Sequence, residues 1–492
     1  MKFISTRSQS NSGVSSAEAI KNGLAPDGGL YMPECIPTLT KEDLDRLSDM
    51  SYPERAAHIL HMYLTDYTEE ELLADCKEAY SEARFPGGAA PLARLGDRMS
   101  VLELWHGPTC AFKDMALQIM PRLLSRALVK TGETRTALIL VATSGDTGKA
   151  ALEGYCDIPQ IKIKVFYPAS GVSRVQKLQM VTQSGDNVSV EAIDGNFDDA
   201  QSGVKRIFSD AAIADALNEK GTFLSSANSI NWGRLAPQIV YYVSAYLDAV
   251  KQGLITMGET LDVCVPTGNF GNIFAACMAK KMGVPLGHLV CASNMNNVLT
   301  DFLDCGTYDR NRPFHTTISP SMDILISSNL ERLLYLVAGP VKTAAYMASL
   351  AKDGRYTLDK ADFDGIREMF SGAYTDEEQT KETIKRVFET EGMLIDTHTS
   401  VACHAAERYL EANAGRKLLL VSTASPFKFA NDVCKALGTT PENELAALDT
   451  LSALTNKKIP TPLDGIGMRK VRFDRVIAPA DMASTVLAFA EA

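Results

Sequence analysis

One lysine lies where its amine could do chemistry, on the apolar side of a predicted helix. The segment Leu104–Lys130 opens with a His-Gly-Pro turn, and Thr109 is placed to cap a helix that Pro121 is expected to kink. The helical repeat puts Lys113 in line with an apolar stripe of Leu117, Met120, Leu124 and Leu128. Such a lysine either extends to solvent from the first turn, or it is a desolvated amine with a lowered pKa that can form a Schiff base.

A second feature is the loop Thr143–Lys149 (TSGDTGK), which joins an apolar run to a predicted helix. The layout is that of a P-loop. A P-loop needs a first glycine five positions before the glycine of its Gly-Lys pair, and a Ser or Thr directly after the lysine. Thr143 and Ala150 occupy those two positions, so the sequence argues against a nucleotide site. Backbone N–H groups at a helix N-terminus still favour an anion, and the alternative is a surface turn with a helix cap.

A third feature is the loop TGNFGN (Thr267–Asn272), which lies between an apolar run and a helix predicted to run from about Asn272 to Met282. Gly268 and Gly271 let the backbone approach a ligand closely, and the two asparagines favour turn and cap conformations. The alternative is a tight turn that needs glycine for its geometry only. Because Thr, Asn and Gly combine at the end of a strand, we expect this loop to bind a phosphate, which makes two anion sites.

Apolar runs and helical stretches alternate from Val101 onward, and these elements must position the loops. The alternation predicts βαβ units with parallel sheets, in which ligands bind beyond the carboxyl ends of the strands. The loops TSGDTGK, PTGNFGN and STASPFKFA all follow such a run. The predicted strands are TALILVA (136–142), IKIKVFYP (161–168), SVEAIDG (189–195), LDVCVP (261–266), LGHLVCAS (286–293) and KLLLVS (417–422).

The sequence therefore predicts an α/β protein with two parallel-sheet domains that face a cleft, preceded by a mostly helical segment. Helices are expected to start at Lys41 and at Glu69, after a turn-rich loop at Gly23–Glu34. The expected parts are an N-terminal helical segment (1–95), a smaller α/β domain with the SGDTG loop (96–245), a larger α/β domain with the GNFGN loop (246–440) and a C-terminal segment (441–492).

Composition and charge narrow the class of protein. The chain has 492 residues, of which 46% are hydrophobic and 22% charged, and this is ordinary for a globular protein of two or three domains. A net charge of −11 argues against nucleic acid or an anionic membrane surface as a partner. No apolar run approaches the length of a membrane span, no secretory signal opens the chain, and the ten cysteines lack CxxC spacing, so we expect a cytoplasmic protein. The seven histidines lack the spacing of a metal site.

Seven motifs together resemble those of threonine synthases of the longer bacterial and fungal type. They are GLAPDGGLYMPE, HGPTCAFKD, ATSGDTG, FYPASGVSRVQKLQM, NSINWGRLAPQ, PTGNFGN and STASPFKFA. They extend from Gly23 to Ala430, and although each is weak alone, seven in one chain are highly specific. The resemblance implies the type II fold of pyridoxal phosphate enzymes, with the active site between two α/β domains.

The resemblance also implies roles for single residues. Lys113 would hold pyridoxal 5'-phosphate as a Schiff base, and Thr423 would face the pyridine nitrogen as a neutral partner. Asp146 stands where many type II relatives carry an Asn that contacts the ring hydroxyl, and Ser144 and Thr147 would meet the carboxylate of the substrate. The phosphate of the cofactor would bind Gly268, Asn269, Phe270, Gly271 and Asn272.

The implied reaction converts O-phospho-L-homoserine and water into L-threonine and phosphate, the last step of threonine biosynthesis. The phosphate of this small-molecule substrate needs a cationic site of its own, for which Arg234 and Lys177 are favoured over Lys149, because Lys149 starts a helix and faces solvent. Asn231 is a weaker candidate. The resemblance leaves open whether the protein is a monomer or a homo-oligomer.

Two alternatives stay open on the residues alone. A threonine or serine dehydratase of the same fold would need no second phosphate site, and the SINWGR and DGGLYMPE motifs would then be unexplained. A regulatory relative that binds the cofactor without chemistry is disfavoured, because Lys113 and all the loop glycines are present.

Overall fold

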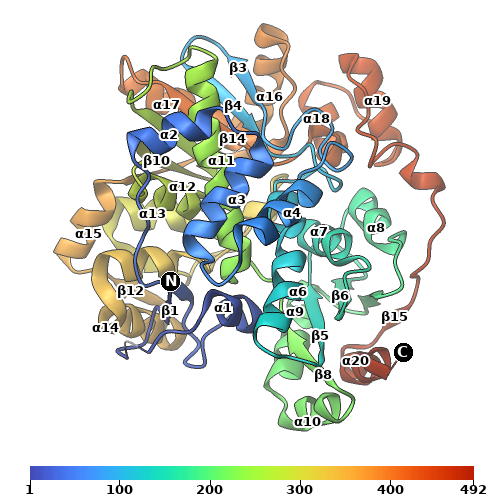
Figure 1. The fold of residues 1–492 in the computed structure, drawn as a ribbon. Helices are drawn as coiled ribbons and strands as arrows, with labels where there is room; N and C mark the ends of the chain where they lie inside the picture. The colour runs from blue at the N-terminus through green and yellow to red at the C-terminus, as the bar shows by residue number, and fades with distance from the viewer. Residues whose placement is uncertain (11, 492) are drawn as a thin grey trace.

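Two sheets of mostly parallel strands, each with helices on both faces, make up most of the molecule (Figure 1). The structure is a computed structural model that describes residues 1–10 and 12–491. The central strands of both sheets are mostly buried on both sides, because helices cover both faces. The predicted α/β class is confirmed by this alternation of strands and helices.

The larger sheet has parallel strands with one antiparallel edge strand, β3. Alternate residues of its central strands pack against α11 and α12 on one face and against α17 on the other. In spatial order its strands are β13 (Phe370–Tyr374), β10 (Leu286–Ser293), β9 (Leu261–Pro266), β14 (Leu418–Ser422), β4 (Met99–Glu103) and β3 (Leu92–Leu95). The helices around it are α11 (Trp232–Lys251), α12 (Gly271–Lys281), α13 (Val298–Cys305), α14 (Leu330–Asp353), α15 (Lys360–Arg367), α16 (Glu377–Glu391), α17 (Thr397–Ala412), α18 (Ala430–Ala436) and α19 (Ala446–Thr455).

The smaller sheet is parallel throughout. In spatial order its strands are β15 (Val476–Ile477), β7 (Val188–Ile193), β6 (Ile161–Pro168), β5 (Thr136–Ala142) and β8 (Thr222–Ser225). Its helices are α5 (Asp114–Leu117), α6 (Met120–Lys130), α7 (Asp146–Tyr155), α8 (Arg174–Val181), α9 (Phe197–Ser209), α10 (Ala211–Glu219) and α20 (Met482–Glu491). The short remaining elements are the strand pair β11 (Thr307–Asp309) and β12 (Arg355–Thr357), and the 3-10 helices η1 (Pro320–Met322), η2 (Pro426–Phe429), η3 (Ile466–Met468) and η4 (Pro479–Asp481).

The predicted strands agree closely with the structure. Four of the six have the expected bounds, namely β5, β6, β9 and β10, and the other two, β7 and β14, differ by one or two residues at their ends. The agreement arises because each run is apolar, β-branched and bounded by turn residues, so local pattern and buried environment favour the same structure.

The N-terminal segment ties the two sheets together. Its elements are β1 (Phe3–Ser5), α1 (Ser16–Asn22), β2 (Tyr31–Pro33), α2 (Lys41–Ser48), α3 (Tyr52–Tyr63) and α4 (Glu69–Ala79). Helix α1 packs on α6 beside the smaller sheet, and α3 packs on α11, which is buried along nearly its whole length (Figure 1). The loop predicted at Gly23–Glu34 contains the short strand β2, which pairs with β1 and so differs from a plain turn.

Each sheet takes a strand from a distant part of the chain. Strands β3 and β4 precede every strand of the smaller sheet, yet they join the larger sheet through β14. Strand β15 follows the last strand of the larger sheet and completes the edge of the smaller one. Strand pairing thus crosses each of the predicted boundaries at residues 96, 246 and 441, and the division of the chain at these positions remains a prediction.

One helix, α14, is long and apolar enough to cross a membrane by length and composition alone, a test that a helix of a globular protein can also pass. Gly339 has φ 74° and ψ 174° and precedes Pro340, so α14 consists of two shorter helices joined at a kink.

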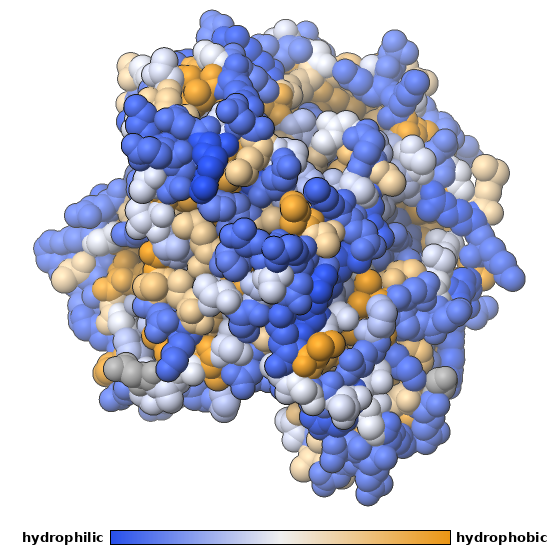
Figure 2. Space-filling view, viewed as in Figure 1, coloured by the Kyte–Doolittle hydropathy of each residue, from blue (hydrophilic) through white to orange (hydrophobic). Residues whose placement is uncertain are grey.

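The face of the molecule in Figure 2 is mostly hydrophilic, with apolar side chains scattered in small groups.

Candidate active site

Lys113 is placed by a stretch of chain that leaves β4 and runs alongside the residues after β14. Ala111 and Ala424 form an antiparallel bridge, and the N–H of Phe112 donates to the C=O of Thr423 at 2.8 Å. This pairing is local to two loops at the carboxyl end of neighbouring parallel strands. It brings the residue predicted to carry the cofactor next to the residue predicted to face its ring nitrogen.

The helix around Lys113 differs from the prediction. Thr109 does not cap a long helix, because its backbone N–H and its hydroxyl donate to the Asp114 carboxylate at 2.8 and 2.7 Å. Helix α5 ends after one turn, and α6 then begins with Pro121 in its first turn, where the missing N–H costs nothing. Burial raises the pKa of Asp114 to about 6, although the hydrogen bonds from Thr109 oppose the rise.

The amine of Lys113 is enclosed at the boundary between the two sheets. The residue is 9% exposed, and its Nζ lies 3.4 Å from Oδ2 of Asp146 and 3.5 Å from Oγ of Ser321. Asp146 starts α7 on the smaller sheet, whereas Ser321 lies in η1 beside the larger sheet. Burial lowers the pKa of the Lys113 amine, while the charge of Asp146 opposes this shift. An amine in this position can act as a base or a nucleophile.

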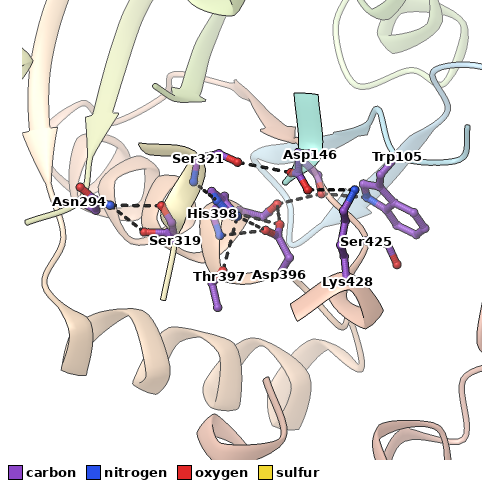
Figure 3. A network of polar contacts seen from close by, with 12 residues as sticks. Trp105, Asp146, Asn294, Ser319, Ser321, Asp396, Thr397, His398, Ser425 and Lys428 are labelled. Atoms are coloured by element: carbon purple, nitrogen blue, oxygen red, sulfur yellow. Dashed lines mark hydrogen bonds and ion pairs between the residues drawn. The ribbon is translucent and has the colours of Figure 1, made fainter. Parts of the chain in front are cut away.

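Asp146 is held by groups from three elements. Its Oδ1 accepts a hydrogen bond from Nε2 of Gln176 at 2.7 Å. The same oxygen lies 3.0 Å from Nζ of Lys428 (Figure 3). Burial by itself would raise the pKa of this carboxyl, but the charges of Lys428 and Lys113 hold it well below its usual range. Asp146 is therefore an ionised carboxylate between two lysines.

Lys428 is a buried lysine that sequence reasoning missed. Its side chain is fully buried in η2, and its Nζ also donates to the C=O of Thr109 at 2.8 Å. The signal for it was a lysine between two aromatic residues, Phe427 and Phe429, in a motif that follows a buried strand.

Ser321 and His398 were also missed, and Figure 3 shows them next to Asp146 and Asp396. The backbone N–H of Ser321 donates to Nε2 of His398 at 3.1 Å, so the imidazole carries its proton on Nδ1 and donates it to Asp396 at 2.7 Å. Asn294 holds the same turn by donating to Oγ of Ser319 at 2.9 Å. A local sequence pattern could not predict these contacts, because the turn around η1, helix α17 and the end of β10 come together only in the folded chain.

The loop TGNFGN leads into α12, which starts at Gly271, one residue before the predicted start. A Cβ on Gly268 would lie 2.6 Å from the C=O of Ser321, so only glycine fits between the loop and η1. Phe270 has φ 63°, and Nδ2 of Asn272 is buried without a partner among residues 1–10 and 12–491. The first turn of α12 points free N–H groups at the loop, as expected for an anion site.

The loop TSGDTGK is tied together by Thr143. Its Oγ1 accepts hydrogen bonds at 3.0 Å from the N–H groups of both Gly145 and Gly148. Ser144 is exposed and Thr147 is half-buried at the first turn of α7. Both are therefore reachable by a ligand at this helix N-terminus.

Lys149 contradicts the expectation that it starts a helix and faces solvent. Helix α7 begins at Asp146, so Lys149 lies one turn inside it and is 8% exposed. Its Nζ donates to Glu153 at 2.8 Å and to Gln183. Because both of these partners are structural, Lys149 holds α7 against the chain that follows α8.

Arg234 is a buried cation in the first turn of α11 and is 3% exposed. Its Nη1 donates to the C=O of Ala227 at 2.7 Å, its Nε has no partner, and no ion pair in the described part of the chain includes it. Burial lowers its pKa to about 10. The side chain of Asn231 caps α11 at Gly233 and donates to the C=O of Ile20, at 2.8 Å each, so both ends are engaged.

The structure brings some predicted residues together and not others. The charge of Arg234 lowers the pKa of the Lys113 amine, whereas Lys177 lies exposed on α8. Thr423 is buried beside the loop of Lys113, and Asn269 is exposed at the rim of its loop. Within residues 1–10 and 12–491, no three His, Cys, Asp or Glu side chains are grouped to hold a metal ion.

Comparisons with known proteins agree along the whole chain. Residues 87–424 match the family described as pyridoxal-phosphate dependent enzyme, residues 2–80 match the threonine synthase N terminus, and residues 399–484 match the threonine synthase C-terminal family. Threonine synthase-like 1 of Homo sapiens is 40% identical over 90% of this chain, which spans only 62% of that protein's length. Threonine synthase of Pseudomonas aeruginosa is 39% identical over 89% of this chain and 90% of its own.

Solved structures give the same picture. The pyridoxal phosphate-bound threonine synthase from Brucella melitensis is 35% identical with a TM-score of 0.89, covering 100% of both chains. Yeast threonine synthase is 34% identical with a TM-score of 0.88, covering 99% of this chain and 97% of its own. The family match over most of the chain and the near full-length relatives lead to one conclusion: this chain belongs to the threonine synthase family of pyridoxal phosphate-dependent enzymes.

Proposed function

We propose that this chain is a threonine synthase, which converts O-phospho-L-homoserine and water into L-threonine and phosphate with pyridoxal 5'-phosphate. One observation carries the proposal: the buried amine of Lys113 lies between Asp146 of the smaller sheet and Ser321 of the larger one. The family to which the chain belongs supports the same activity.

The residues present fit pyridoxal phosphate. The cofactor needs an amine for its aldehyde, N–H donors for its phosphate and a partner for its ring nitrogen. Lys113 supplies the amine, and the first turn of α12 with Gly268, Asn269, Phe270, Gly271 and Asn272 supplies the donors. The unpartnered Nδ2 of Asn272 is a feature that a bound phosphate would explain.

The chemistry that pyridoxal phosphate supplies when bound is withdrawal of electrons from the substrate, which makes its Cα and Cβ protons acidic. Lys113 then acts as the base that takes and returns these protons, because burial favours its neutral form. Asp146 and the hydroxyl of Ser321 flank the amine and hold it in place. Thr423 offers a neutral contact to the ring nitrogen, which leaves the ring less charged than an Asp partner would.

The remaining residues orient the substrate. The hydroxyls of Ser144 and Thr147 bind its carboxylate, and Arg234 binds its phosphate, since its guanidinium is buried with an unused Nε. Lys177 and Asn231 are weaker proposals, because one is exposed and the other already has partners at both ends.

We further propose that the protein works in the cytoplasm as a monomer or homo-oligomer and uses neither nucleic acid nor membrane as a partner. The net charge of −11 supports the last point, and all ten cysteines are free thiols, as in a reducing compartment.

The test is to incubate the purified, cofactor-loaded protein with phosphohomoserine and to measure threonine and phosphate. We expect both products in equal amounts, a yellow protein, and a borohydride-fixed mass tag on the peptide of Lys113 but not on that of Lys428. Release of 2-oxobutanoate from threonine would favour a dehydratase instead. A colourless protein without turnover would favour a regulatory relative.

A further inference from the structure

The two oxygens of Asp146 face different lysines. Oδ1 is bonded to Lys428 at 3.0 Å and to Gln176 at 2.7 Å, whereas Oδ2 lies 3.4 Å from Lys113 and 3.4 Å from Ser321. Because the interaction of two charges weakens with distance, the nearer lysine is the principal counter-ion of the carboxylate. The lysine that would do the chemistry is the more distant of the two.

The geometry of Lys428 is that of a fixed charge. Its side chain is fully buried, and besides Asp146 its Nζ is bonded to the C=O of Thr109 at 2.8 Å. A buried ammonium needs such partners, since leaving it unpaired is costly. Lys428 lies in η2, directly after the chain that pairs with the loop of Lys113, so its position is coupled to the site.

The proposed reaction needs a neutral Lys113 amine, although the carboxylate of Asp146 lies beside it. A base must be neutral before it takes a proton, yet a buried carboxylate beside an amine favours the ammonium form. Without another cation, Asp146 would hold Lys113 as its ion-pair partner. The charges that act on the pKa of the Lys113 amine are those of Asp146 in α7, which raises it, and of Lys428 in η2 and Arg234 in α11, which lower it.

We propose that Lys428 is a positioning residue: it takes the Asp146 carboxylate as its own ion-pair partner and thereby leaves the Lys113 amine free to be a base. This inference rests on the proposed function, because it explains how a base works beside a carboxylate. The alternative is that the pair only joins η2 to α7. That structural role would change the stability of the protein and leave the protonation of Lys113 unchanged.

The test measures the protonation of Lys113 in the full-length chain freed of cofactor. Acetic anhydride labels only neutral amines, so peptide mass spectrometry of Lys113 over a pH series gives the midpoint of its titration. Lys428→Met should raise this midpoint by about one pH unit, because a like charge has been removed and the carboxylate is left to Lys113. Labelling at a fixed pH below the midpoint then falls about tenfold.

Further variants separate charge from structure. In Asp146→Asn/Lys428→Met, a neutral pair, the midpoint should return toward that of the wild type, and it should lie above that of Asp146→Asn alone. Lys428→Arg keeps the charge and should leave the midpoint unchanged. The matched control is Lys164→Met, which breaks another buried pair, with Glu191 at 2.9 Å, and should lower stability without moving the midpoint of Lys113.

The inference is overturned if Lys428→Met folds, by circular dichroism, and labels Lys113 like the wild type. Should that variant not fold, equal midpoints in Asp146→Asn and Asp146→Asn/Lys428→Met overturn it instead. The labelling involves no substrate. A protein that labels as expected and still makes no threonine therefore refutes the proposed reaction, not the charge arrangement.

Discussion

The first turns of α7 and α12 are built alike and are charged differently. Each follows a buried parallel strand, β5 or β9, and each begins with a short loop that contains glycines. The loop before α12 carries no charged residue, whereas α7 opens on Asp146, an ionised carboxylate paired with Lys428. The helix dipole of α12 is thus open to an anion from outside, while that of α7 already has one of its own. We call each loop with the first turn of its helix a junction. A junction of this kind can bind an external anion or carry a carboxylate of its own, depending on the first residue of the helix.

Lys113 lies where the two junctions meet, so removing it tests whether α12 works alone. Lys113→Ala should lower turnover by about a thousandfold or more, because the base is lost. It should still bind pyridoxal phosphate through the first turn of α12, which equilibrium dialysis can measure. A variant that no longer bound the cofactor at all would show that α12 does not act as a separate receptor.

Gly268→Ala should damage the α12 junction without changing any charge. The new Cβ would meet the C=O of Ser321 at 2.6 Å, so the loop must shift and cofactor affinity should fall about a hundredfold. The matched control is Gly365→Ala in α15, where a Cβ meets nothing within 4 Å. Equal affinity in the two variants, measured by fluorescence titration, would contradict the close packing of the loop on η1.

Asp146→Asn should show that α7 carries an internal ion pair. Because Lys428 would be left unpaired and buried, we expect a loss of about 3 kcal/mol in the free energy of unfolding at pH 7. The folded-state pKa of Asp146 is depressed, so its contribution is present above the unfolded pKa and is lost as the pH falls. The difference in the free energy of unfolding between wild type and variant, measured by urea unfolding, should become smaller below about pH 4. A difference that became larger there would contradict a depressed pKa of Asp146.

The binding of the substrate phosphate gives a smaller expected effect than the three changes above. If α7 is occupied by its own carboxylate, a guanidinium must hold the phosphate of the substrate, and Arg234→Met should raise KM for phosphohomoserine about tenfold. Lys177→Met should leave KM within about twofold, because Lys177 is exposed on α8. Steady-state kinetics with a larger effect at Lys177 would move the phosphate site to α8.

Replacing Thr423 by Asp would test the proposed neutral contact between Thr423 and the ring nitrogen of the cofactor. A charged partner at the ring nitrogen keeps the ring protonated, so the absorption spectrum of the cofactor and the mixture of products should change. An unchanged spectrum and product mixture would place Thr423 away from the ring.

The sequence predicts the strands and helix ends that carry the site better than the side chains that meet inside it. Strands β5 and β9 and the start of α12 follow from apolar runs and glycine-containing turns, which act over a few residues. Lys428, Ser321 and His398 come from segments far from Lys113 along the chain, and only tertiary packing brings them together. The prediction of one continuous helix capped by Thr109 is wrong for a different, local reason: Thr109 donates to the carboxylate of Asp114, and α5 ends after one turn.

The pairing of β4 with β14 bears on the synthesis of the protein. Lys113 leaves the ribosome early, yet the segment that positions it, around Thr423 and Ala424, is translated some three hundred residues later. A chain grows at about 5–20 residues per second, so for many seconds the lysine and its loop wait without their partner strand. A nascent chain stopped before β14 should therefore carry Lys113 as an ordinary solvated amine.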